Sequence, residues 1–241
     1  MKNLILFLLL AYPLVGWAQV KREGYALYEV KRDLHANLTK DQEKYKAMMP
    51  PFFTAKFDYF FNAKESIFKY SEEEDDEEAD NNGMGARMRM MRPNLEIYLN
   101  NAEKTRSELR GGMGKDYLLE GDAKNHSWKL TDETAKVAGY DCKKATCADK
   151  DGKPVLAWYA ESIPVFMGPM GYSGLPGLIL KMDIDNGITI CEVKKLTFQK
   201  NKENVIIKPT KGKKITEEEF DAEIKKMRSE SKPKIQMKSK E

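Results

Sequence analysis

Apolar and polar residues alternate over short stretches along most of this chain, which is the pattern of half-buried β-strands. The clearest alternation puts five residues on one face of a predicted strand: Phe53, Ala55, Phe57, Tyr59 and Phe61. A turn over residues 62–65 then leads into a second strand over 66–70, so we predict a hairpin. The same pattern predicts a first strand over 24–34, and residues 37–49 suggest a short helix.

Further short strands follow, each bounded by a cluster of Gly, Asn or Asp residues. They are predicted over 95–99, 104–109, 116–120 and 126–130. A hairpin over 137–146 and 154–162 is expected to turn near Asp151-Gly152. Another, over 178–185 and 188–198, turns at Asn186-Gly187, the strongest two-residue hairpin signal. The apolar pattern slips near Ile190 and Cys191, which predicts a β-bulge there.

The last element has the period of a helix. Thr216 and Glu219 form a capping box, and an apolar stripe follows at Phe220, Ile224 and Met227. This predicts an amphipathic helix of about four turns. We expect the stripe to dock on the protein's own sheet, in preference to a partner.

About ten short strands and one late helix predict a mainly β fold. We expect one antiparallel, strongly curved sheet or half-barrel with a C-terminal amphipathic helix. By analogy it is similar to the lipoprotein-carrier (LolA-like) half-barrels. The expected organisation is a signal peptide at 1–18, one β domain at 19–230 and a polar tail at 231–241. An acidic, solvated loop lies inside the domain at 71–83.

The N-terminal segment predicts export. Lys2 precedes an apolar run over 4–11, and a small-x-small site ends at Ala18, as in a cleaved signal peptide. The alternative is an uncleaved anchor, but the apolar run is short for a membrane span. Cleavage after Ala18 leaves a periplasmic or secreted chain beginning at Gln19, with no cysteine for lipid attachment. We expect no later transmembrane span.

Charge excludes one class of partner. The net charge is +3, with 33% charged residues of both signs, which is not the basic footprint of a nucleic-acid-binding protein.

Residues 157–180 combine aromatic side chains with rigid prolines and permissive glycines, which predicts a loop of defined shape. Its end, residues 175–178, fits a type II turn with Gly177 at the position of positive φ. The loop serves either core packing or recognition of a ligand or partner. The candidate binding residues are Trp158, Tyr159, Pro164, Phe166, Pro169, Tyr172, Leu175, Pro176 and Leu178. Trp158 and Tyr159 are hypothesised to line the concave face of the sheet.

The same loop carries a family resemblance. Residues 174–179 read GLPGLI, the hexapeptide that names the GLPGLI family of secreted bacterial proteins. The stretches 139–145, 157–159 and 163–169 resemble accompanying blocks of that family, so the likeness spans about residues 133–198. The resemblance implies an exported protein of a gram-negative envelope, in a family with no established activity.

The sequence offers few candidate catalytic residues. His35 and His126 lack companions at ligand spacing, and none of the common hydrolase, zinc-protease or P-loop motifs occurs. If 142–147 is one strand, Cys142 and Cys147 point to opposite faces, so any disulfide would involve Cys191. The alternative is buried thiols. We therefore expect no enzyme and no cofactor.

The leading hypothesis is an exported, non-enzymatic envelope binding protein. Its curved sheet would hold an apolar ligand, a peptide or a membrane-protein partner. One alternative is a copper-binding protein that uses the methionine-rich loop from Met84 to Met91, since thioethers favour Cu(I). Arg87, Arg89 and Arg92 in that loop would repel the cation. The other alternative is a structural or assembly protein of the envelope.

Overall fold

The computed structural model describes residues 22–40, 43–72, 94–112, 114–124 and 126–230. Within these residues twelve strands form one open sheet. The strands are β1 (Gly24–Asp33), β2 (Phe52–Phe61), β3 (Glu65–Tyr70), β4 (Leu95–Asn100), β5 (Thr105–Gly112), β6 (Lys115–Asp122), β7 (Lys129–Val137), β8 (Tyr140–Ala148), β9 (Pro154–Ala160), β10 (Leu178–Ile184), β11 (Thr189–Thr197) and β12 (Lys213–Lys214). The helical elements are η1 (Glu43–Met48), η3 (Pro169–Gly171) and α2 (Glu217–Glu230). The predicted mainly β fold with one C-terminal helix is confirmed.

The sheet consists of two meanders joined through β1. Its order is β12-β6-β5-β4-β3-β2-β1-β11-β10-β9-β8-β7. Neighbours pair antiparallel except at the end, where β12 pairs parallel with β6 through Lys213 and Lys214. The prediction of a strictly antiparallel sheet is therefore wrong at this edge. The chain after β11 runs over the sheet, where Ser107 Oγ donates to the carbonyl oxygen of Pro209, and it joins β6 in the same direction.

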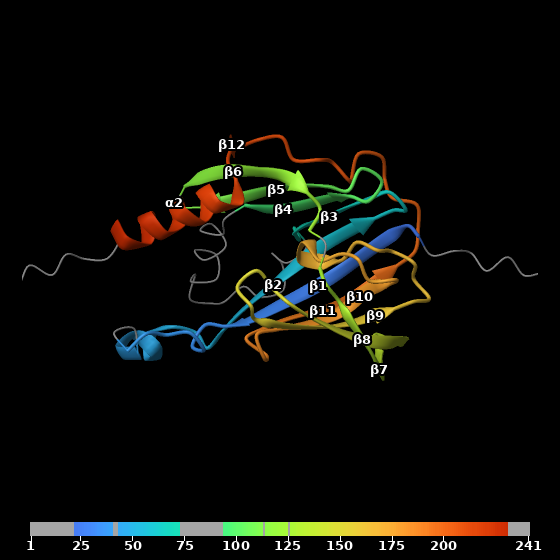
Figure 1. The fold of residues 1–241 in the computed structure, drawn as a ribbon, viewed down its shortest axis with the longest axis horizontal. Coiled ribbons are helices and arrows are strands. Elements are labelled where there is room, and N and C mark those ends of the chain that lie inside the picture. Colours follow the sequence, from blue (N-terminus) through green and yellow to red (C-terminus); the bar gives the residue numbers. More distant parts are fainter. Residues whose placement is uncertain (1–21, 41–42, 73–93, 113, 125, 231–241) are drawn as a thin grey trace, which may run out of the picture.

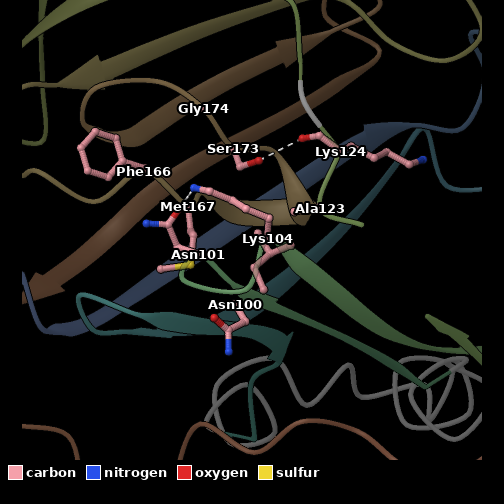
Figure 2. Close-up of a pocket in the computed structure, with 10 residues that line it drawn as sticks. Asn100, Asn101, Lys104, Ala123, Lys124, Phe166, Met167, Ser173 and Gly174 are labelled. Carbon is pink, nitrogen blue, oxygen red and sulfur yellow. Dashed lines mark hydrogen bonds between the residues drawn. The ribbon is translucent and has the colours of Figure 1, made fainter. Parts of the chain in front are cut away.

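The connection from β6 to β7 leads from β6, next to the edge strand β12, to the opposite edge strand β7. We call residues 123–128 the crossover and residues 161–177, between β9 and β10, the flap. The two are hydrogen-bonded: Ser173 Oγ donates to the carbonyl oxygen of Lys124 at 3.1 Å, as Figure 2 shows. Trp128 Nε1 donates to the carbonyl oxygen of Ser173 at 2.8 Å. The strand predicted over 126–130 therefore begins only at Lys129, because Trp128 bonds to the flap.

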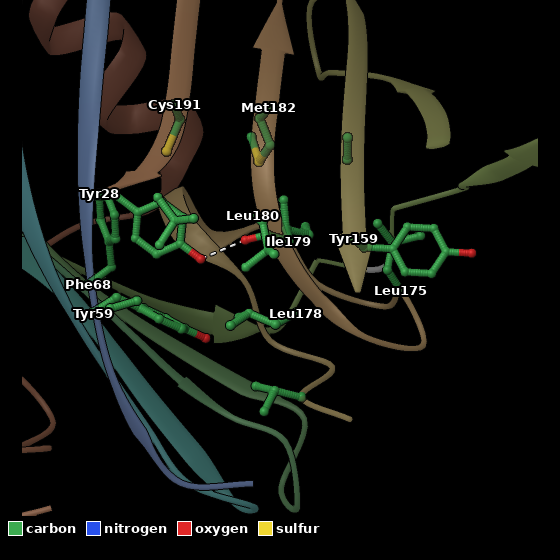
Figure 3. Close-up of a cluster of buried hydrophobic side chains, with 14 of the residues drawn as sticks. Tyr28, Tyr59, Phe68, Tyr159, Leu175, Leu178, Ile179, Leu180, Met182 and Cys191 are labelled. Atoms are coloured by element: carbon green, nitrogen blue, oxygen red, sulfur yellow. Dashed lines mark hydrogen bonds between the residues drawn. The ribbon is translucent and has the colours of Figure 1, made fainter. Parts of the chain in front are cut away.

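The core lies between the inner face of the sheet and the flap, which sits among the strands in Figure 1. Tyr28 and Tyr59 are fully buried, with ring centroids 5.8 Å apart. The Tyr28 hydroxyl donates to the carbonyl oxygen of Ile179 at 2.6 Å (Figure 3). Flap residues Ile163 and Leu175 belong to the same buried cluster.

The predicted hairpins are confirmed, but the predicted bulge is wrong. Asn186 and Gly187 adopt φ of 53° and 90°, as a tight turn between β10 and β11 requires. Ile190 and Cys191 pair regularly with β10. The bulge lies at Lys194, between the pairs Leu27–Lys195 and Tyr28–Val193. Placed there, Lys194 reaches the Glu29 carboxylate at 3.2 Å.

The C-terminal helix docks on the sheet, as predicted. The Glu219 amide donates to Thr216 Oγ1 at 3.1 Å, and the Thr216 amide donates to Glu219 Oε2 at 3.0 Å, which is the capping box. The Phe220 ring packs edge-on against Tyr117 with centroids 5.4 Å apart. In the part of the chain that the structure describes, no helix is both long and apolar enough to cross a membrane. The predicted signal peptide (1–18), most of the acidic loop and the tail (231–241) lie outside the described residues.

Candidate functional site

The flap is a narrow, internally bonded loop. The Gly168 amide donates to the carbonyl oxygen of Tyr172 at 2.7 Å, and the Gly174 amide donates to that of Phe166 at 2.8 Å. Gly171 and Gly174 have φ of 81° and 96°, values that suit glycine because it has no Cβ. Backbone bonds and glycine geometry together give this loop its shape.

The type II turn predicted at 175–178 is wrong. Gly177 does not lie in the positive-φ region that such a turn needs. Glycine is required for another reason: a Cβ there would lie 2.2 Å from the carbonyl oxygen of Ala160. The end of the flap passes that close to the end of β9.

The nine predicted binding residues fall into three groups. Four are buried, namely Tyr159, Pro169, Leu175 and Leu178. Three are half-buried, namely Trp158, Pro164 and Tyr172. Phe166 and Pro176 are exposed, and Phe166 retains 47% of its accessible surface. The loop thus consists largely of core-packing side chains, with one large aromatic residue left in solvent.

Trp158 and Tyr159 do not share a face of β9. Adjacent strand residues point to opposite sides, and Tyr159 belongs to the inner, buried set. Trp158 is paired across the strands with Lys144 and Lys181, so it lies on the outer face with those two lysines. β9 is central in its meander but fully buried on only one face.

A groove of about 520 Å³ lies beside the exposed aromatic residue (Figure 2). We call it the Phe166 groove. The flap contributes Phe166, Met167, Ser173 and Gly174, and the crossover contributes Ala123 and Lys124. The end of β4 and the turn into β5 contribute Leu99, Asn100, Asn101 and Lys104. Segments distant in sequence thus meet at one concave site.

The wall opposite the flap is a structured polar turn. Asn100 Oδ1 accepts the amides of Ala102 and Glu103, each at 3.0 Å. Lys104 Nζ donates to Asn101 Oδ1 at 2.7 Å. These side chains are held in place before any ligand arrives. The sequence marks them only as a strand boundary, so no local signal identifies them as groove residues.

The flap side of the groove is held by residues of β2 and β3. The Tyr59 hydroxyl donates to the carbonyl oxygen of Met167 at 2.8 Å, and Ser66 Oγ lies 3.6 Å from Met167 Sδ. Met167 is buried while Phe166, next to it, projects outward. The exposed ring therefore stands on a fixed base.

The cysteines are free thiols, so the disulfide considered for Cys191 is absent from the structure. Cys142 and Cys191 are buried, and Cys147 is half-buried. Burial raises the pKa of Cys142 and of Cys147 to about 11 and that of Cys191 further still. All three are therefore protonated and weakly nucleophilic at neutral pH.

Within the described residues, no group of three His, Cys, Asp or Glu side chains is arranged to hold a metal ion. The methionine-rich loop from Met84 to Met91, proposed as a copper site, lies outside those residues.

Comparisons with known proteins agree with the fold and give no activity. A family model described as "Protein of unknown function (Porph_ging)" matches residues 148–181, from the end of β8 through the flap into β10. This match fits a family of unknown function and does not establish the GLPGLI name. No curated protein matches the chain.

Solved structures share the fold. PNGF-II, in C2 and P21 crystal forms, is similar with a TM-score of 0.56 and 15% identity over 86% of this chain. The chain spans only about a third of PNGF-II (33% and 34% of those two chains). An uncharacterized conserved protein from Thermus thermophilus is less similar, with a TM-score of 0.41 and 5% identity over 82% of this chain and 91% of that one. The likeness to PNGF-II is one of fold alone.

Proposed function

We propose that this chain is an exported, non-enzymatic envelope binding protein that recognises an apolar side chain of a peptide or membrane-protein partner at the Phe166 groove. The observation that carries the proposal is the exposure of Phe166, at 47%, in a flap that is otherwise largely buried and hydrogen-bonded. An exposed aromatic ring on a rigid base, beside a concave polar wall, resembles the anchor sites of protein interfaces.

A lipid carrier of the half-barrel type fits less well. Such a carrier needs an open apolar cavity on the concave face of its sheet. Here Val165, Met167 and Leu175 of the flap are buried against that face. The groove beside Phe166 mixes apolar side chains with the polar groups of Asn100, Asn101 and Lys104, which suits a side chain of a peptide better than an acyl chain. We therefore favour the peptide or protein partner named in the proposal.

Strand addition at a sheet edge is a less suitable mode of recognition. At the β7 edge, Leu130 pairs with Ala145 and Thr134 pairs with Lys143, so three residues of β7 bulge opposite Lys144. Two of the three, Asp132 and Glu133, are acidic and exposed. Bulges and charges on an edge discourage a further strand. A side-chain groove is the better candidate.

A binding role also agrees with the state of the potential catalytic groups. His126 is stacked on Tyr172 with centroids 4.5 Å apart, and burial lowers its pKa. His35 Nε2 lies 3.1 Å from the carbonyl oxygen of Met49. Burial keeps the three thiols protonated at neutral pH.

The proposal can be tested with a phage-displayed peptide library selected on the purified chain. We expect enriched peptides that carry an aromatic or large aliphatic residue. Phe166→Ser should weaken their binding about tenfold or more, the size expected for an interface anchor. The matched control is Phe52→Ser, since Phe52 is equally exposed at 46% and lies outside the groove. Enriched peptides that bind Phe166→Ser as tightly as the parent chain would refute the groove as the site.

Export is tested separately by the intact mass of the protein taken from its native cells. Removal of residues 1–18 is the expected result, with Gln19 as the first residue. A full-length mass would contradict the cleaved signal peptide but would not test the proposed binding site at the Phe166 groove.

A further inference from the structure

A second cleft, of about 710 Å³, lies where the flap and the crossover meet α2. We call it the charged cleft. Its lining includes Arg106 and Arg110 of β5, Lys124 and His126 of the crossover, Tyr172 of the flap and Glu217 of α2. It shares only Lys124 with the lining of the Phe166 groove. Nothing in the proposed function uses it.

Four cations face a single carboxylate in this cleft. The shortest separations from the carboxylate oxygens of Glu217 are 2.6 Å to Lys124 Nζ, 3.4 Å to Lys150 Nζ, 3.9 Å to Arg110 Nη2 and 4.0 Å to Arg106 Nη1. Only Lys124 and Lys150 are within hydrogen-bonding distance. The two guanidinium groups face Glu217 without bonding to it.

The two arginines also have a second partner in common. Arg106 and Arg110 both pair with Glu108, whose side chain is only 2% exposed. Two guanidinium groups therefore share one buried carboxylate. Arg106 Nε is buried and has no hydrogen-bond partner among the described residues. A Cβ placed on Gly171 of the flap would lie 3.7 Å from it, so this nitrogen faces the flap wall of the cleft.

A second buried nitrogen shows the same lack of a partner. His126 Nδ1 has no hydrogen-bond partner in the described part of the chain. Burial and the nearby charges of Lys124 and Arg106 lower the pKa of His126. Burial, and then repulsion from Arg110, lowers the pKa of Arg106 to about 10. Arg106 Nε and His126 Nδ1 thus both lack a hydrogen-bond partner among the described residues at this end of the cleft.

The acidic groups on the other rim are already engaged. Asp149 Oδ1 accepts the amides of Asp151 and Lys153, both at 2.8 Å. Asp221 pairs with Lys150 at 2.6 Å. Among the described residues of α2, Glu217 is the acidic residue that contacts Arg106 and Arg110. Its position at the arginines follows from the docking of α2 on the sheet.

We propose that the charged cleft binds a small carboxylate-bearing ligand, and that Glu217 occupies the carboxylate position in the ligand-free chain. The ligand's carboxylate would bond to the guanidinium groups of Arg106 and Arg110, whose planar donors match two carboxylate oxygens. The Tyr172 ring, stacked on His126, forms the wall beside it. Glu217 would then be an internal competitor. Removing its charge should open the site.

The test is calorimetric titration of glutarate into the full chain at low ionic strength. Glu217→Gln should bind glutarate about tenfold or more tightly than the parent chain, because the competing charge is gone. The matched control is Glu218→Gln: it removes the same charge one residue away, from an exposed side chain that does not line the cleft. It should bind glutarate as the parent chain does.

A further variant identifies the site of binding. Lys150→Gln in the Glu217→Gln background should lower glutarate affinity about fivefold or more, since a cation beside the carboxylate position is lost. Lys150 lines the charged cleft but not the Phe166 groove, and it is 44% exposed, so the change should leave the fold intact. Three results would overturn the proposal: equal binding by Glu217→Gln and Glu218→Gln, unchanged affinity in the Lys150 variant, or binding of inorganic phosphate but not glutarate. None of them bears on the Phe166 groove.

Discussion

The hydroxyl of Tyr59 donates a hydrogen bond of 2.8 Å to the carbonyl oxygen of Met167, a residue 108 positions further along the chain. Both residues are buried, so the bond ties β2 to the base of the flap in a water-free setting. Tyr59→Phe removes the donor and keeps the ring. We expect a loss of about 1–3 kcal/mol in the free energy of unfolding, because a buried acceptor loses its partner.

Urea unfolding followed by tryptophan fluorescence measures that loss. Tyr159→Phe is the matched control, because its ring is buried on the same face of the sheet while its hydroxyl does not tie the flap to β2. It should change the free energy of unfolding by no more than about 0.5 kcal/mol. Equal effects of the two substitutions would show that the Tyr59 bond adds nothing.

Alkaline pH should loosen the same region. Burial raises the pKa of Tyr28 and of Tyr59 in the folded chain. The unfolded pKa is about 10, so their contribution to stability is complete below pH ~10 and is lost as the pH rises from there toward the folded value. The free energy of unfolding should therefore fall above pH ~10. Tyr59→Phe should flatten this decline by up to about 1.4 kcal/mol per pH unit. If Tyr59→Phe left the slope of the free energy of unfolding against pH unchanged, the raised pKa of Tyr59 would be contradicted.

Gly177→Ala should be severely destabilising. The new Cβ would lie 2.2 Å from the carbonyl oxygen of Ala160 and 2.5 Å from its carbon, and both are backbone atoms that cannot swing away. We expect a loss of about 3 kcal/mol or more, or failure to fold. Gly121→Ala is the control: nothing lies within 4 Å of its Cβ position. It should stay within about 0.5 kcal/mol of the parent chain in thermal or urea unfolding.

The thiols should be counted with Ellman's reagent. All three cysteines are free, so three thiols should react in denaturant. In the folded chain Cys142 and Cys191 should be silent because they are buried, and half-buried Cys147 should react slowly because its pKa is about 11. Raising the pH toward 11 should speed Cys147 first. Fewer than three thiols in denaturant would reveal a disulfide and contradict the structure.

Local sequence patterns were sufficient to predict most of the strands. Alternation in β2, the Asn186-Gly187 turn and the Thr216–Glu219 capping box each involve neighbours in sequence, and each was predictable. The bulge was predicted near Ile190–Cys191 but lies at Lys194. Its position could not be read from the sequence because it depends on pairing between β11 and β1. Pairing between segments so distant in sequence leaves no local signature.

The candidate site was predictable only in part. The flap was located from its prolines, glycines and aromatics, but which of its side chains face inward depends on Tyr28, Tyr59 and Ser66 of other strands. Gly177 was assigned to a turn when its role is close approach to Ala160. Arg106 and Glu217 come together only because α2 docks on β5 and β6, and neither carries a motif.

The place of β1 between the two meanders has a kinetic consequence. β1 pairs with β2, next along the chain, but also with β11, through contacts such as Tyr25 with Thr197. During vectorial synthesis one side of β1 stays unpaired until nearly the whole sequence has emerged. Non-local pairing of this kind slows folding. We therefore expect closure of the β1–β11 seam to be a late step of folding.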